Sequence, residues 1–256
     1  MPILINHWGA VLPDNFDPRI VDGLVSRHRV IATDYRGIGA SGGTVPLTVD
    51  EMARDAMALI RALGFEKVDL FGFSLGGFVA QDIALKAPGL VHKLILAGTG
   101  PAGGKDIDKV GAVSQPLIEK GRSTGTDPKF FLFFTSSDTG RQAAKAFLNR
   151  LQERKTDRDN GPTSEAFARQ LQAIEAWGRQ APQDLGSIQV PVLIANGEQD
   201  LMVPTDNSRD LARRIPNAQL IIYEDAGHGG IQPPPLFNTW RAVASKSERR
   251  NPRLSM

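Results

Sequence analysis

Residues 68–81 read Val68-Asp69-Leu70-Phe71-Gly72-Phe73-Ser74-Leu75-Gly76-Gly77-Phe78-Val79-Ala80-Gln81, and this stretch decides the fold. The part before the serine is almost entirely apolar and does not alternate, which is typical of a strand buried on both faces of a parallel sheet. The part after it suits a helix. Gly72 and Gly76 flank Ser74 and let the two backbones approach closely. A sharp turn of this kind exposes a serine hydroxyl above the sheet edge, so the stretch predicts a nucleophile.

The same pattern, G-x-S-x-G, occurs at two further places in the chain, around Ser41 and around Ser123. Ser41 lies in a glycine-rich loop that runs to Pro46, and Ser123 lies among polar residues that predict a turn. Neither serine has a strand before it and a helix after it. We therefore expect Ser74 to be the nucleophile.

Other short apolar runs rich in β-branched residues predict further strands. Together with residues 68–73 they lie at 3–6, 30–33, 94–97, 190–195 and 220–223. Helical patterns separate several of them, and the clearest is 48–63, where Thr48 and Glu51 form a capping box and Gly64 follows the end. Strands that alternate with helices predict the α/β class with a doubly wound, mostly parallel sheet.

The alternation divides the chain into three parts. Residues 1–104 and 188–230 are expected to form the α/β core. Residues 105–187 hold no convincing strand but show helical patterns at 139–153 and 164–177, so we expect an inserted helical lid. Residues 231–256 form an atypical tail with three consecutive prolines, five basic residues and one acidic residue.

A serine nucleophile needs a base, and the base needs an orienting acid. His228 lies in a glycine-rich loop after the last predicted strand, where a sheet of this kind would place the base. His28 is expected at the surface, and His92 lies at the wrong end of its strand. Asp200, in the turn after residues 192–195, is the predicted acid, with Glu198 of the same turn as the alternative.

Composition excludes several other classes of protein. The chain has 256 residues, no cysteine and a formal net charge of +2, so thiolate metal sites and disulfides are excluded. The basic tail accounts for the positive charge, which gives no reason to expect nucleic-acid binding. No run reaches the roughly 18 apolar residues of a membrane span, and we expect a cytoplasmic protein. Residues 37–42 and 98–103 fit G-x-G-x-x-G, but neither opens a helix, so no nucleotide cofactor is expected.

The chain order Ser74, Asp200, His228 resembles the α/β-hydrolase superfamily, in its serine esterase, non-haem haloperoxidase and aminopeptidase-like branch. The matching segments are 34–41 (DYRGIGAS), 72–77 (GFSLGG), 197–200 (GEQD) and 227–229 (GHG). The resemblance implies a catalytic triad without a metal or cofactor. It also implies an oxyanion hole made by two backbone N–H groups, those of Leu75 and Trp8, with Gly9 as the alternative to Trp8.

The activity implied by the resemblance is hydrolysis of a small or medium carboxylic ester, or of an activated acyl compound, through an acyl-enzyme. A serine aminopeptidase, a perhydrolase and a non-catalytic ligand-binding protein of the same fold remain open. The expected partner is a small-molecule substrate. In the aromatic run 130–134, Phe131 and Phe134 are the candidates for an apolar wall over the site, and lid core is the alternative.

The superfamily also implies an order for the strands, in which Val30 to Thr33 lies at the edge, outside residues 3–6. Its members usually carry a hairpin that covers this edge, and the chain shows none before Pro2. Unpaired backbone groups on an edge strand invite pairing with another chain. A homo-oligomer through Val30 to Thr33 is therefore expected.

Overall fold

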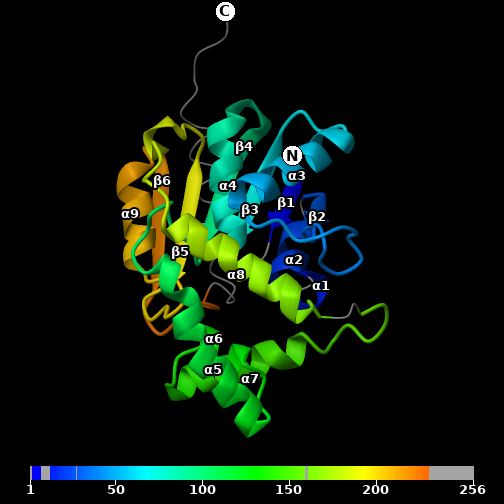
Figure 1. Ribbon diagram of the computed structural model, residues 1–256, viewed down its shortest axis with the longest axis vertical. Coiled ribbons are helices and arrows are strands. Elements are labelled where there is room, and N and C mark those ends of the chain that lie inside the picture. Colours follow the sequence, from blue (N-terminus) through cyan, green and yellow to red (C-terminus); the bar gives the residue numbers. More distant parts are fainter. Residues whose placement is uncertain (1, 7–11, 27, 159–160, 231–256) are drawn as a thin grey trace, which may run out of the picture.

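A parallel sheet forms the centre of the computed structural model, which describes residues 2–6, 12–26, 28–158 and 161–230 (Figure 1). The strand order is β2-β1-β3-β4-β5-β6, and every pairing is parallel. This confirms the predicted fold class and the predicted order. The strands are β1 (Ile3–Asn6), β2 (Val30–Ala32), β3 (Val68–Phe73), β4 (Val91–Ala97), β5 (Val192–Gly197) and β6 (Ala218–Tyr223).

Burial explains why the central strands do not alternate in sequence. Every residue of β3 and of β5 is buried, because helices cover both faces of the middle of the sheet. The edge strands β2 and β6 are half-exposed. Strand β4 begins three residues before its predicted start, so His92 lies inside it, and β2 ends one residue early at Ala32.

The helices of the core follow their sequence signals. Helix α3 (Val49–Ala62) begins where the Thr48 side chain accepts a hydrogen bond from the Glu51 backbone N–H. Helix α4 (Leu75–Lys86) starts directly after Ser74 and packs on α3 and on strands β1, β3 and β4. The other helices are α1 (Leu12–Asn15), α2 (Pro18–Val25) and α9 (Asp206–Arg214). No helix in the described part of the chain is long and apolar enough to cross a bilayer.

In the described part of the segment between β4 and β5, the regular secondary structure is all helical. Figure 1 shows α5, α6 and α7 grouped beyond one end of the strands and α8 running back toward the sheet. The bounds are α5 (Val110–Thr124), α6 (Lys129–Phe133), α7 (Asp138–Arg150) and α8 (Ser164–Gly178). The predicted helical patterns are confirmed in α7 and α8. The predicted turn at Ser123 is wrong, because this serine lies in the last turn of α5.

Two contacts fix this segment to the core. The Trp177 ring, on α8, stacks on Phe78 of α4 with ring centroids 5.5 Å apart, and the indole N–H donates to the Gly100 carbonyl at 3.3 Å. The Arg150 Nε, on α7, donates to both carboxylate oxygens of Asp17 at 3.0 Å. Asp17 is fully buried and also caps α2, so α7 and α2 are joined by one carboxylate.

Candidate active site

Ser74 occupies a strained turn between β3 and α4. Its backbone has φ 54° and ψ −122°, a conformation that residues other than glycine rarely adopt. The Ser74 N–H donates to the Ala97 carbonyl at 2.9 Å, and the Thr99 hydroxyl donates to the Ser74 carbonyl at 2.9 Å. A Cβ atom at Gly72 would lie 2.3 Å from the Gly76 carbonyl oxygen. The glycines of the motif are therefore required by the close approach of strand and helix.

Asp200 and His228 form a buried pair, although 28 residues separate them in the chain. His228 Nδ1 lies 2.8 Å from Asp200 Oδ2, and the imidazole is fully buried. Asp200 Oδ1 accepts the backbone N–H groups of Met202 and Val203, each at 2.9 Å. An ionised carboxylate can only accept, so Nδ1 carries the proton. His228 Nε2 is left as an acceptor, and no described residue forms a hydrogen bond with it.

Aromatic rings hold the imidazole in place. The Phe73 ring lies 4.9 Å from the His228 ring, and the Phe133 ring meets it edge-on at 5.5 Å, measured between centroids. Since Phe73 directly precedes Ser74, the first of these contacts brings the histidine next to the strained turn. The structure thus pairs Asp200 with His228 and places this pair against the residue before Ser74; among the described residues no hydrogen bond joins Ser74 to His228, and the action of the three as a triad stays a prediction.

Gly98 and Thr99 also belong to this site, and sequence reasoning missed them. They lie in the segment 98–103, which the sequence analysis weighed only as a nucleotide motif. Gly98 has φ 54°, and a Cβ there would lie 2.9 Å from the Phe73 ring and 3.4 Å from the imidazole. The available signal was topological: parallel strands β3 and β4 are neighbours, so the residues that follow them meet at the same edge.

The loop that carries His228 is tied to the inserted helices. The Gly229 N–H donates to the Phe133 carbonyl at 2.8 Å. The hydroxyls of Ser137 and Thr135 each donate to the Asp225 carboxylate at 2.7 Å. These two hydrogen bonds hold the pKa of Asp225 below its usual range. The position of the histidine therefore depends on residues 133–137.

Leu75 is the first residue of α4, and the first turn of a helix leaves its N–H groups without intrahelical acceptors. This N–H is the expected first oxyanion donor. Trp8 and its alternative Gly9 lie outside the described residues, so the second donor stays an expectation.

The alternative site residues are engaged elsewhere. The Glu198 carboxylate pairs with Arg209 at 2.6 Å on the surface. His92 Nδ1 lies 2.8 Å from the Asp69 carboxylate within β3 and β4, and His28 is half-buried next to the start of β2. The Ser41 N–H closes a turn onto the Ile38 carbonyl. Among the described residues, no cluster of histidine and carboxylate side chains could hold a metal ion.

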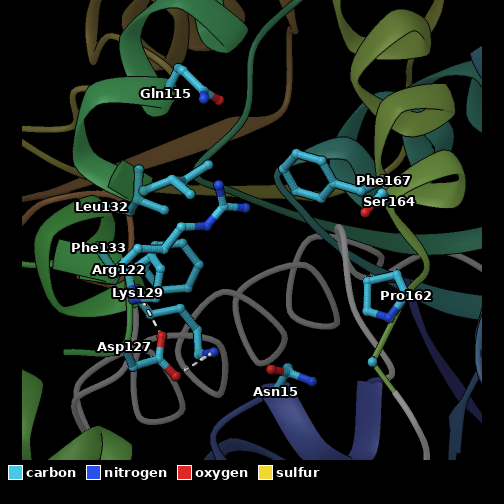
Figure 2. Close-up of a pocket in the computed structure, with 13 residues that line it drawn as sticks. Asn15, Gln115, Arg122, Asp127, Lys129, Leu132, Phe133, Pro162, Ser164 and Phe167 are labelled. Carbon is cyan, nitrogen blue, oxygen red and sulfur yellow. Dashed lines mark hydrogen bonds and ion pairs between the residues drawn. The ribbon is translucent and has the colours of Figure 1, made fainter. Parts of the chain in front are cut away.

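A cavity of about 450 Å³ lies between α5, α6 and α8 (Figure 2). Phe133 joins this cavity to His228, because its side chain lines the cavity and also contacts the imidazole. Phe131 packs on Phe130 at 5.2 Å and beneath the Lys120 ammonium at 4.5 Å. Phe134 packs on Phe147 and lines a second cavity of about 380 Å³. Sequence reasoning thus missed Phe133, the phenylalanine of residues 130–134 that contacts the base.

The sequence pattern of the α/β-hydrolase fold family matches residues 2–231. The chain belongs to the α/β-hydrolase fold family. The sheet order and the site agree with this assignment, and the resemblance seen in the sequence is confirmed.

Relatives and solved structures support the family assignment. An α/β-hydrolase fold protein from Chitinophaga pinensis is 36% identical, with a TM-score of 0.84, and the match covers 99% of this chain and 90% of that one. A protein named carbamate hydrolase RutD, from Agrobacterium fabrum, is 31% identical over 86% of this chain and 83% of its own. Proline iminopeptidase PfmaB from Pestalotiopsis fici is 27% identical over 89% and 85%. The chain is a hydrolase of the α/β fold.

Proposed function

We propose that the protein is a serine hydrolase that cleaves a small or medium carboxylic ester, or an activated acyl compound, through an acyl-enzyme. The observation that carries the proposal is the state of His228. Its Nδ1 is bonded to Asp200, its buried Nε2 accepts no hydrogen bond from any described residue, and its ring packs on Phe73, the residue before Ser74. An imidazole held in this way is set up to take a proton from a neighbouring hydroxyl.

In the proposed reaction, the Ser74 hydroxyl gives its proton to His228 Nε2 as Oγ attacks the acyl carbonyl. Asp200 keeps the ring in the required tautomer and stabilises the imidazolium that forms. The Leu75 N–H, together with that of Trp8, donates to the oxyanion. His228 then protonates the leaving group, and it activates the water that releases the acid.

The core is proposed to comprise residues 1–104 and 188–230, with residues 105–187 as a lid over the site and 231–256 as an atypical tail. The aromatic run 130–134 within the lid supports its role in substrate selection. Phe131 and Phe134 remain the proposed apolar wall, and Phe133 joins them because it contacts His228.

A serine aminopeptidase is the second candidate, and the similarity to a proline iminopeptidase favours it. A perhydrolase, in which peroxide replaces water, and a non-catalytic binding protein of the same fold are further alternatives. The test is a panel of p-nitrophenyl esters and aminoacyl anilides, assayed beside Ser74→Ala. The proposal expects ester cleavage that Ser74→Ala abolishes. Cleavage of anilides alone would favour the peptidase, and cleavage of esters by Ser74→Ala at the parent rate would refute the mechanism.

The proposed partners follow from the same chemistry. The substrate is a small molecule, and neither nucleic acid nor a membrane is needed for the reaction. We also propose a cytoplasmic location and self-association through the edge strand β2.

A further inference from the structure

Arg122 lies in the last turn of α5, and its exposed side chain lines the 450 Å³ cavity to which Phe133 also belongs (Figure 2). Among the described residues, no hydrogen bond or ion pair engages this side chain. The other cation of the cavity differs, because Lys129 Nζ pairs with the Asp127 carboxylate at 2.9 Å. The described residues of the cavity carry two cationic side chains and one carboxylate, which leaves one uncompensated positive charge, on Arg122.

The surroundings of this charge are mostly apolar. Opposite the guanidinium, across the cavity, lies Phe167, and Leu132 and Phe133 line the side formed by α6 (Figure 2). Phe133 also contacts the imidazole of His228. A molecule whose reacting end lies at Ser74 could therefore extend along apolar side chains and meet an unpaired guanidinium at its far end.

We propose that Arg122 binds a carboxylate on the substrate, so that the hydrolase prefers acyl compounds with a free carboxylate remote from the bond that is cleaved. This inference rests on the proposed function and names its substrate class. A guanidinium matches a carboxylate with two parallel hydrogen bonds. A carboxylate also neutralises the single excess charge, whereas a phosphate with a charge of about −2 would overcompensate it.

The test compares esters that differ only in the remote group. One series places the carboxylate on the acyl side, with p-nitrophenyl half-esters of glutarate, adipate and suberate against their methyl diesters. The other places it on the alcohol side, with 4-hydroxybenzoate esters against those of methyl 4-hydroxybenzoate. The expected result, in at least one series, is a kcat/KM about tenfold or more higher for the carboxylate.

The variant Arg122→Gln is expected to remove this preference while changing neutral esters less than twofold. Arg61→Gln is the matched control, because Arg61 is an exposed arginine in the last turn of another helix, α3. It removes the same charge from an equivalent helix end and should preserve the preference. Arg122→Glu should go further and favour an acyl chain that ends in trimethylammonium.

The inference is overturned if the parent shows no preference in either series, or if Arg122→Gln keeps it. An equal loss in Arg61→Gln would also overturn it, because the effect would then be one of net charge. Calorimetry tests the inference without an activity measurement: it compares the binding of monomethyl adipate to Ser74→Ala with the binding of dimethyl adipate to the same variant. If no ester is cleaved but Ser74→Ala binds the monoester through Arg122, the proposed function fails and the carboxylate site stands.

Discussion

Asp200 uses its two oxygens for two tasks. Oδ1 accepts two backbone N–H groups and fixes the turn, while Oδ2 accepts the proton-bearing nitrogen of His228. Asp200→Asn can keep the first task but places an amide donor against Nδ1, which favours the wrong tautomer. We expect kcat to fall by about 10⁴, the loss known for such a substitution in a serine protease triad.

Glu198→Gln is the matched control for this measurement. Glu198 lies two residues away in the same turn, but its carboxylate pairs with Arg209 at the surface. Its kcat should stay within about twofold of the parent, since a surface ion pair is worth little. A large loss in Glu198→Gln together with an active Asp200→Asn would show that the acid has been misassigned.

Substitution of Gly98 distinguishes the effect of backbone strain from the effect of crowding in the active site. Gly98→Ala should destabilise the fold by at least ~1 kcal/mol, because φ is positive, and should also lower kcat, because the methyl group presses on Phe73 and the imidazole. Gly125→Ala is the control, since Gly125 has a similar φ of 63° and open space around it. It should lose comparable stability with kcat unchanged. Urea unfolding measures the stability of each variant, and steady-state kinetics measure its kcat. Equal kcat values in the two variants would contradict this account.

The residues of the site were predictable to different degrees. Ser74, Asp200 and His228 stand in short segments whose local pattern carries their position. Phe133 was not distinguishable from Phe131 and Phe134, because α6 is a helix of only five residues. Which of its side chains faces the histidine depends on the hydrogen bond between Phe133 and Gly229, and that contact joins distant parts of the chain.

At the level of elements, the histidine loop and the inserted helices act as one unit through Asp225. The pKa of the Asp225 carboxyl is lower in the folded protein than in the unfolded chain, where it is about 3.9. The contact therefore stabilises the fold at pH values above about 3.9, and this stabilisation is lost as the pH falls through the lower pKa of the folded state. The difference in Tm between the parent and Asp225→Asn should therefore be largest near neutral pH and should shrink below about pH 4.

Asp206→Asn is the control for the catalytic consequence of that contact. Asp206 also has a lowered pKa, caused by Lys105, but it lies at the surface on α9. Asp225→Asn should lower kcat several-fold by loosening the loop, whereas Asp206→Asn should not. A Tm difference that is constant from pH 3 to pH 7 would mean that the carboxylate charge of Asp225 does not hold the loop.

The elements themselves differed in how well the sequence predicts them. The strands were predictable because burial on both faces gives unbroken apolar runs. Helix α5 was missed because Gly111, Pro116 and Gly121 interrupt it, and these residues have low helix propensity. Packing of α5 against α6 and α8 outweighs this propensity, and such packing cannot be seen in a local pattern.

At the scale of the whole molecule, β2 lies at the end of the sheet order and pairs only with β1 among the described strands. We expect sedimentation velocity to show a dimer or a larger species that forms through this edge. Ala32→Lys is the probe, because Ala32 is exposed and lies inside the strand, whereas Thr33 follows its end. The variant should be more monomeric. A parent that stays monomeric at high concentration, with its amides at 30–32 protected from exchange, would refute the expectation.

The central claim is that Ser74 is a nucleophile activated by His228, and covalent labelling with a fluorophosphonate tests it most directly. The account predicts one phosphonyl group per chain in the intact mass, located on Ser74 by peptide mapping, absent in Ser74→Ala and formed much more slowly in His228→Gln. Ser41→Ala should be labelled at the parent rate. An adduct on Ser41 or Ser123, or labelling of Ser74 that is as fast in His228→Gln as in the parent, would contradict the account.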